Sequence, residues 1–293
     1  MLCLTLTAAY PEVSPVYLAD TVGDGVPVAH EGSALNAEVI ATFSSGFYVK
    51  DEKQRIFAVG SPAIPAGPLH LVLKHAPPKP NDGTPVTIRS NALDIGPVSI
   101  SLKSATRFSP FNPRPGDLAL AIPVLAGLYK SRNIPQDILP VFAALTSALH
   151  ADDLDGARNI LQGRGDGLTP SGDDVLAGLL LFHAWSGRPV KDLLGVALNA
   201  KTNDLSRAFL KWTARGQSIQ PVHDLIRLAL KLSLEIRPLP AQRLKSELMR
   251  AVDDLSRIGH SSGVALLTGL SLAARLYWRP INSPETPQHV DAP

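Results

Sequence analysis

The segment 163–174, GRGDGLTPSGDD, brings glycines, hydroxyls and adjacent carboxylates together directly before the apolar run VLAGLLLF. Glycine at alternate positions (Gly163, Gly165 and Gly167) frees the backbone to adopt positive φ or to approach a ligand closely. The polar residues that follow, up to the pair Asp173 and Asp174, are typical of a helix start. The sequence therefore predicts a loop that leads into a buried helix.

Such a junction suits anion binding. Ser171 or Thr169 is expected to cap the helix, Pro170 fits its first turn, and the free N–H groups there attract negative charge with the help of the helix dipole. A well-capped helix explains Ser171 and one aspartate, but not the second carboxylate. The functional interpretation is that loop amides bind phosphate or carboxylate, while Asp173 or Asp174 handles a metal ion, a cationic group or a proton.

A second motif, RIGHSSGVALLTG at 257–269, repeats this logic before another apolar helix. Its glycines Gly259 and Gly263 enclose His260 and two serines, so an imidazole, hydroxyls and free amides converge at one helix end. A neutral His260 can polarise a carbonyl or act as a general acid, whereas a histidine that only bonds its own loop is the alternative. If the two buried helices run in parallel, both loops share one pocket.

Other polar clusters carry weaker signals. Asn203, Asp204 and Ser206 in KTNDLSRAF predict a third helix start of ordinary capping type. The remaining histidines lack paired ligand spacing, so no histidine zinc site is expected. Neither a P-loop nor a strand-linked G-x-G-x-x-G fingerprint occurs, which disfavours ordinary nucleotide binding.

Composition narrows the partners. The net charge of +2 over 293 residues provides no basic footprint for nucleic acid, so small molecules or proteins are the expected partners. The single cysteine, Cys3, excludes an internal disulfide and fits a reducing cytoplasm. The first residues lack the basic segment of a signal peptide, and the longest uncharged apolar stretch, VALLTGLSLAA, is too short to cross a bilayer. A cytoplasmic protein without membrane attachment is expected.

The chain divides by pattern into an α+β protein. Short β-rich segments separated by turn signals such as NDG and KDEKQ predict an antiparallel sheet or small barrel over 1–113. From 114 to 279, apolar residues recur at helical spacing in eight segments, and the two that are apolar almost all round are expected at the centre. The tail 280–293 has no core-forming residues and is expected to be disordered.

The two motifs in this order, G-x-G-x-G-L-T-P-S-G-D-D and later G-H-S-S-G before an apolar helix, resemble a family first catalogued as a domain of unknown function. Its named member is the AllH subunit of oxamate carbamoyltransferase. The β-half segments FSSGFYVKDEKQRIFAVG, PAGPLHLVL and SLKSATRFSP are also similar to that family. The candidate anion-binding residues of the motifs are Gly165, Gly167, Thr169, Ser171, Gly172, Ser261, Ser262 and Gly263. The candidate catalytic residues are Asp173, Asp174 and His260.

This resemblance implies a subunit of an enzyme that moves a carbamoyl group between oxamate and phosphate in purine or allantoin nitrogen catabolism. The implied partners are an anionic small molecule and the other subunits of the complex. Two alternatives stay open: a non-catalytic structural or regulatory subunit, and a phosphate-handling enzyme that uses Mg²⁺ on Asp173 and Asp174. No cofactor other than this possible Mg²⁺ is expected.

Overall fold

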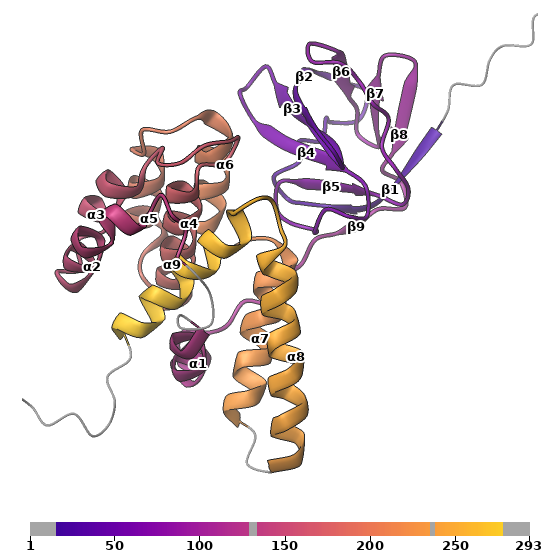
Figure 1. The fold of residues 1–293 in the computed structure, drawn as a ribbon. Coiled ribbons are helices and arrows are strands. Elements are labelled where there is room, and N and C mark those ends of the chain that lie inside the picture. Colours follow the sequence, from indigo (N-terminus) through magenta and orange to yellow (C-terminus); the bar gives the residue numbers. More distant parts are fainter. Residues whose placement is uncertain (1–15, 129–133, 235–237, 278–293) are drawn as a thin grey trace, which may run out of the picture. The chain divides into compact units, whose positions relative to one another are not determined.

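A computed structural model describes residues 16–128, 134–234 and 238–277. The chain forms two compact units, residues 1–108 and 109–293, the first built of strands and the second of helices (Figure 1). The predicted α+β class is therefore confirmed. The tail expected to be disordered, 280–293, lies outside the described residues, as do Cys3 and the other residues before Val16.

The first unit is a closed barrel whose strands follow one another around a ring in the order β5-β4-β3-β2-β6-β7-β8-β1, with β1 returning to β5. The strands are β1 (Val16–Val22), β2 (Leu35–Phe43), β3 (Gly46–Asp51), β4 (Ile56–Gly60), β5 (His70–Leu73), β6 (Pro85–Ile88), β7 (Ala92–Ile95), β8 (Val98–Ser101) and β9 (Thr106–Arg107). The short β9 pairs with β1 beyond the end of β8. The barrel predicted from the sequence is thus present.

Strand β1 closes the ring because its residues pair on both sides. Val16–Leu18 pair with β8 in parallel, and Ala19–Val22 pair with β5 in antiparallel orientation. The pairs β4–β5 and β1–β9 are also parallel. The sequence did not indicate these parallel pairs, because local alternation of apolar residues fixes which face is buried but not which strand becomes the neighbour.

The barrel interior follows the two-residue period of its strands. The buried alternating pairs are Phe47 and Val49, Phe57 and Val59, Leu71 and Leu73, Val86 and Ile88, and Leu93 and Ile95. The predicted turn at KDEKQ is confirmed. Asp51 closes that turn by accepting hydrogen bonds from the amides of Lys53 at 3.0 Å and Arg55 at 2.8 Å.

The second unit is helical throughout its regular structure. Its elements are α1 (Pro115–Leu128), the short 3₁₀ turn η2 (Leu139–Val141), α2 (Phe142–His150), α3 (Leu154–Leu161), α4 (Ser171–Trp185), α5 (Val190–Leu198), α6 (Asp204–Thr213), α7 (Gln220–Leu234), α8 (Pro238–Ser256) and α9 (Ser262–Tyr277). The sequence did not predict α3, which buries only Leu154, Ala157 and Leu161 and contains Gly156, so its apolar signal is short.

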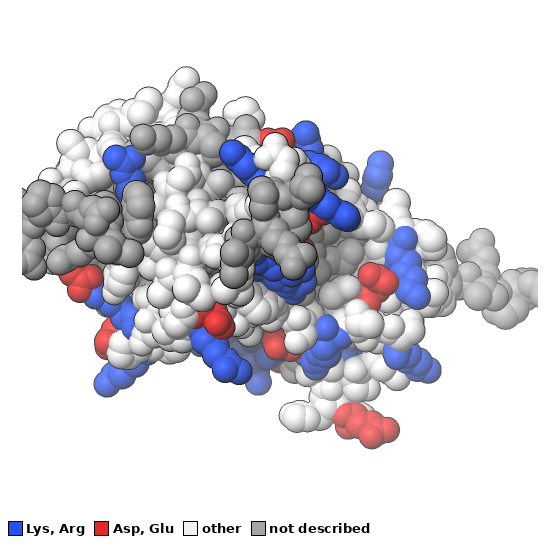
Figure 2. Space-filling view, turned by 90° about the horizontal axis from the view of Figure 1, so that it is seen from below, with Lys and Arg blue, Asp and Glu red and all other residues white. Residues whose placement is uncertain are grey.

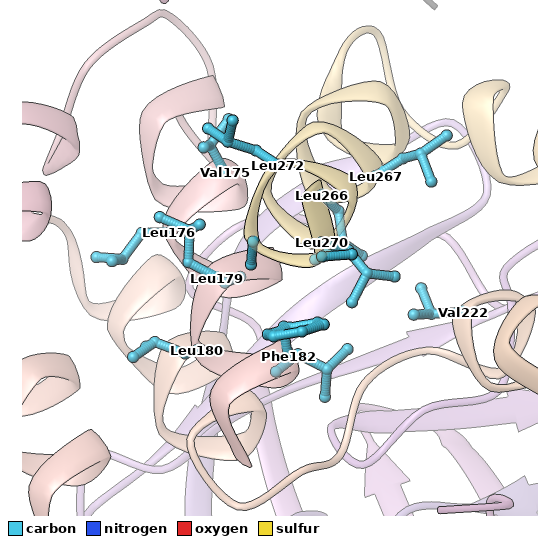
Figure 3. Packing of buried hydrophobic residues seen from close by; sticks show 14 of the residues in the cluster. Val175, Leu176, Leu179, Leu180, Phe182, Val222, Leu266, Leu267, Leu270 and Leu272 are labelled. Carbon is cyan, nitrogen blue, oxygen red and sulfur yellow. The ribbon is translucent and has the colours of Figure 1, made fainter. Parts of the chain in front are cut away.

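Helices α4 and α9 form the centre of this unit, as their all-round apolar sequences predicted. Leu266 and Leu270 of α9 lie against Leu179 and Phe182 of α4 in the core (Figure 3). Their backbones come unusually close at two glycines. A Cβ on Gly178 would lie 2.2 Å from the Leu266 carbonyl oxygen, and a Cβ on Gly269 would lie 2.0 Å from the Val175 carbonyl oxygen.

This crossing shows that α4 and α9 run in the same direction. Gly178 meets Gly269 near the middle of each helix, and near the beginnings the Thr169 and Ser262 hydroxyls are 3.0 Å apart. At the other ends, the rings of Phe182 and Tyr277 are in contact, with centroids 5.4 Å apart. The two polar loops that precede these helices therefore lie at the same end of the helix pair.

The surface carries both signs of charge. On the face shown in Figure 2, Lys and Arg side chains are scattered among Asp and Glu side chains and separated by uncharged surface. None of the helices in the described part of the chain combines the length and the apolar character that a bilayer span needs.

The helix crossing predicts a sharp contrast between two glycine-to-alanine changes. Gly269→Ala forces a methyl group onto the Val175 carbonyl, so we expect the free energy of unfolding to fall by about 1–3 kcal/mol. Gly195→Ala, in α5 with open space around its Cβ position, should instead raise it by up to about 1 kcal/mol. Urea denaturation of both variants measures the difference, and equal stability would show that the α4–α9 crossing is looser than described.

Candidate functional site

The two predicted loops meet at a hydroxyl pair. Thr169 precedes α4 and Ser262 begins α9, and their side-chain oxygens are 3.0 Å apart. The structure thus brings together two of the predicted anion-binding residues from motifs more than ninety positions apart in the chain. The carboxyl group of Asp174, in the first turn of α4, belongs to the same cluster.

Asp174 is the least satisfied polar group of this cluster. Part of the residue is accessible, yet its Oδ2 atom is buried and has no hydrogen-bond partner among the described residues. Burial raises the pKa of the Asp174 carboxyl to about 8, and the nearby charge of Asp173 adds to this shift. The side chains of Ser262 and Thr169 oppose the shift by hydrogen bonding to the carboxyl group. Asp174 is therefore largely protonated at neutral pH and able to donate or accept a proton there.

Its neighbour Asp173 has the opposite environment. The side chain is buried, Oδ1 accepts a hydrogen bond from the Gly163 amide at 2.8 Å, and Oδ2 accepts one from the Thr202 hydroxyl. Both carboxylate oxygens are thus bound within the protein. Asp173 thereby joins the start of the glycine loop and Thr202, two positions before α6, to the first turn of α4.

The sequence predicted that Ser171 or Thr169 caps α4, and neither does. Pro170 occupies the N-cap position without a side-chain cap, and Ser171 is the first helical residue. Its buried hydroxyl donates to Asp137 Oδ2 at 3.0 Å and lies 3.5 Å from the Arg164 carbonyl oxygen. The prediction assumed the usual local bond from hydroxyl to amide, but a distant carboxylate provides a charged acceptor instead.

Most of the predicted anion-binding glycines are needed for the backbone conformation or for close packing. Gly165 and Gly167 have φ of +104° and +96°, which favour glycine. A Cβ on Gly172 would lie 2.0 Å from the Leu161 carbonyl oxygen, and one on Gly263 would lie 1.7 Å from the Leu255 carbonyl oxygen. These positions therefore require glycine for conformation or close packing, whether or not a ligand binds.

The two helix N-termini differ in their free amides. At α4, the amides of Gly172, Asp173 and Asp174 already donate to carbonyl oxygens of the preceding loop. At α9, Gly263 donates to Ile258, whereas no hydrogen bond between described residues uses the amides of Ser262 and Val264. The first turn of α9 also lacks an acidic residue, while that of α4 holds two. The α9 start is thus the more favourable place for an anion.

His260 and Ser261 stand at the edge of this cluster. His260 is exposed in the turn before α9, and no hydrogen bond joins its side chain to another described residue. The carbonyl of Ser261 accepts the Ala265 amide at 2.9 Å, which begins the helix. The structure therefore leaves His260 available to a ligand but does not bond it to Asp174.

Two residues that contact the motif were missed in the sequence. Asp137 lies 34 positions before its partner Ser171, and no local pattern indicates such a contact. Thr202 stands in KTND, where the sequence predicted an ordinary helix start and no contact with the glycine loop. Arg164, the loop's only arginine, directs its Nε to the Ile160 carbonyl at 3.3 Å, so it turns back on α3.

Across the described ranges, no group of three or more His, Cys, Asp and Glu side chains is placed to hold a metal ion. Because both oxygens of Asp173 are already bound, Asp174 is the carboxylate of the predicted pair with an oxygen to spare.

Comparison with known families agrees with the motif. A model of the family described as oxamate carbamoyltransferase subunit AllH matches residues 161–274. The predicted resemblance is therefore confirmed for the region from the glycine loop to α9, which includes both motifs. The match does not extend into the barrel, so the similarity of the β segments stays a prediction. No solved structure matches the chain.

The two adjacent aspartates predict opposite changes in stability. A carboxyl whose pKa is higher in the folded chain than the ordinary value of about 3.9 favours folding below that value, and this contribution is lost as the pH rises toward 8. Asp174→Asn removes the buried charge, so at pH 8 we expect about 1–3 kcal/mol of added stability. Asp173→Asn breaks bonds to a charged acceptor and should destabilise the fold by a similar amount.

Thermal unfolding of both variants and the parent at pH 4.5 and pH 8 checks these signs. The gain from Asp174→Asn should shrink at the lower pH, where the parent chain is also neutral at this position. A loss of stability at pH 8 from Asp174→Asn would contradict the assigned environment.

Proposed function

We propose that this chain is a subunit of a carbamoyltransferase that moves a carbamoyl group between oxamate and phosphate, with part of the reaction site at the beginnings of α4 and α9. The observation that carries the proposal is the buried, unpartnered Asp174 oxygen beside the Thr169–Ser262 pair. An ionisable group in this state costs stability, and such groups are concentrated at functional sites. The match of residues 161–274 to the AllH family supports the same reaction.

The α9 start is the proposed place for the anionic end of the substrate. Free amides of Ser262 and Val264, the helix dipole and the Ser262 hydroxyl provide donors without a competing carboxylate in that turn. The exposed His260 then contributes a donor to the carbonyl oxygen of the carbamoyl group, where negative charge develops during transfer. Gly263 permits the close packing on which this start depends.

Asp174 is proposed as the proton-transfer group. When a carbamoyl group passes from the oxamate nitrogen to phosphate, a phosphate oxygen forms a bond to the carbamoyl carbon and the bond from carbon to nitrogen breaks. The departing nitrogen needs a proton, which protonated Asp174 donates, and in the reverse direction the Asp174 carboxylate accepts it. A pKa of about 8 allows both states near neutral pH.

Asp173 takes a supporting role in this proposal. It was predicted as a catalytic candidate, but its two bonded oxygens leave it better suited to hold the loop and to keep a negative charge beside Asp174. Ser171 and the loop glycines likewise shape the site rather than bind the anion.

We further propose that the other subunits complete the site and that the complex works in the cytoplasm in purine or allantoin nitrogen breakdown. Carbamoyl phosphate and oxamate are both anionic, and Arg164, the arginine within the glycine loop, is turned away toward α3. A partner subunit would supply the missing arginine clamp. A purely structural subunit and a Mg²⁺-dependent phosphate enzyme are the outcomes against which this proposal is tested.

In the complex reconstituted with its partner subunits, Asp174→Asn should lower kcat for carbamoyl transfer by about 100-fold to 10,000-fold, because the variant cannot exchange the proton. His260→Ala should lower kcat by about 100-fold through loss of a donor to the carbonyl oxygen. Asp192→Asn, an exposed acid in the first turn of α5, is the matched control and should keep full activity. Product formation from carbamoyl phosphate and oxamate measures all three.

Assembly of each variant complex is followed by size-exclusion chromatography. Full activity of Asp174→Asn with intact assembly would reject the proposed catalytic role. Lost assembly in both site variants, but not in Asp192→Asn, would instead support a structural subunit. Dependence on Mg²⁺ together with ATP consumption would support the phosphate enzyme.

A further inference from the structure

We propose that Asn203 is a positioning residue for this site: its side-chain amide holds the Leu168 carbonyl, and so fixes Thr169 against Ser262 and Asp174. The inference rests on the proposed function. It assigns a second role to a residue that the sequence indicates only as a helix cap.

Asn203 uses both ends of its side-chain amide. The oxygen Oδ1 accepts the Ser206 amide at 2.9 Å, which caps α6, and the nitrogen Nδ2 donates to the Leu168 carbonyl oxygen at 3.0 Å. Capping needs only the acceptor, which Ser, Thr or Asp supplies equally well. Asp153, which caps α3 by accepting the Gly156 amide at 2.7 Å, is such an ordinary case. The Nδ2 donor of Asn203 is therefore not needed for capping and binds the glycine loop instead.

The connection between α5 and α6, residues 199–203, binds the glycine loop region at further points. The Thr202 hydroxyl donates to Asp173, and the Lys201 amide donates to Gln162 Oε1 at 2.8 Å. Together with the Asn203 bond, these contacts reach Gln162 directly before the loop, Leu168 within it and Asp173 near its end. Each hydrogen bond contributes modestly alone, but several bonds from one short segment order the loop jointly.

The connection is itself held in place. Arg207 Nη2 donates to the Thr202 carbonyl at 2.7 Å and to the Ala200 carbonyl at 3.2 Å. Its Nη1 forms an ion pair with Asp204 Oδ1 at 3.0 Å. The bonds to the loop therefore start from a segment that is fixed to α6.

The glycine loop needs this support because it has little of its own. No hydrogen bond between described residues uses the amides from Gly165 to Thr169, and three of the loop's glycines, Gly163, Gly165 and Gly167, have positive φ. Glycine-rich backbone has much conformational entropy to lose on ordering. Leu168, the residue that Asn203 holds, is largely exposed, so packing does not fix it. The bond to its carbonyl is thus the restraint next to Thr169.

Loss of this restraint has a chemical consequence at Asp174. The Thr169 side chain favours the ionised form of Asp174 and lowers its pKa. If Thr169 moves away, the pKa of Asp174 rises further and the carboxylate form becomes scarcer at neutral pH. Asn203 would therefore tune proton transfer without contacting the substrate.

The test replaces Asn203 by serine, which keeps the cap, adds no charge and removes the amide donor. In Asn203→Ser, we expect the NMR order parameters of backbone amides 165–169 to fall, while those of α6 stay at parent values. The pH midpoint of Asp174, followed by carboxyl carbon NMR in the intact chain, should rise. The matched control is Asp153→Ser at the ordinary cap of α3, which should change neither quantity.

Activity of the reconstituted complex separates this inference from the function beneath it. Asn203→Ser should lower kcat and displace its pH profile upward, with Asp153→Ser unchanged. If the loop order parameters and the Asp174 midpoint stay at parent values, the positioning role is wrong, whatever the reaction. If the parent complex transfers no carbamoyl group, the proposed function is wrong, and the order parameters and the titration still decide the role of Asn203 independently.

Discussion

The close approach of α4 and α9 is the constraint on which the rest of the helical unit depends. At Gly178 and Gly269 there is no room for even a methyl group, so each helix backbone lies directly on the other. Leucines pack on either side of that contact and bury almost the whole length of both helices (Figure 3). So tight a crossing fixes the relative direction of α4 and α9 and their relative position along the helix axes. It therefore fixes the distance between the two loops that precede the helices.

A buried helix pair leaves polar chemistry only at its ends, and here the chain concentrates it at one end. Adjacent carboxylates in the first turn of α4 then fall into different environments because they point in different directions from the helix. Asp173 reaches the amide of Gly163 and the hydroxyl of Thr202, whereas Asp174 faces the α9 start with one oxygen unpartnered. The extensive core supplies the stability that tolerates such a group.

Much of this arrangement could be predicted from the sequence, for local reasons. Glycine spacing and the apolar run that follows indicated a loop leading into a buried helix, and the repeated pattern before α9 indicated a second one. The contacts of Ser171 with Asp137 and of Asp173 with Thr202 could not be predicted, because they join segments with no shared periodicity. The parallel strand pairs could not be predicted for the same reason, since neighbours in space are set by topology rather than by local pattern. The helix α3 was missed for a local reason, because it is short and contains Gly156.

The two helix starts, similar in sequence, are electrostatically unequal, and this follows from where the acids lie. At the α4 start, the backbone amides already donate to the preceding loop. Asp137 and Asp173 also contact this start, so it does not attract a further anion. The α9 start has free amides and no acid of its own. A ligand that spans the cluster therefore meets donors on the α9 side and carboxyl groups on the α4 side. The proposed substrates, oxamate and carbamoyl phosphate, each combine an anionic end with an amide, so the proposed function agrees with this asymmetry.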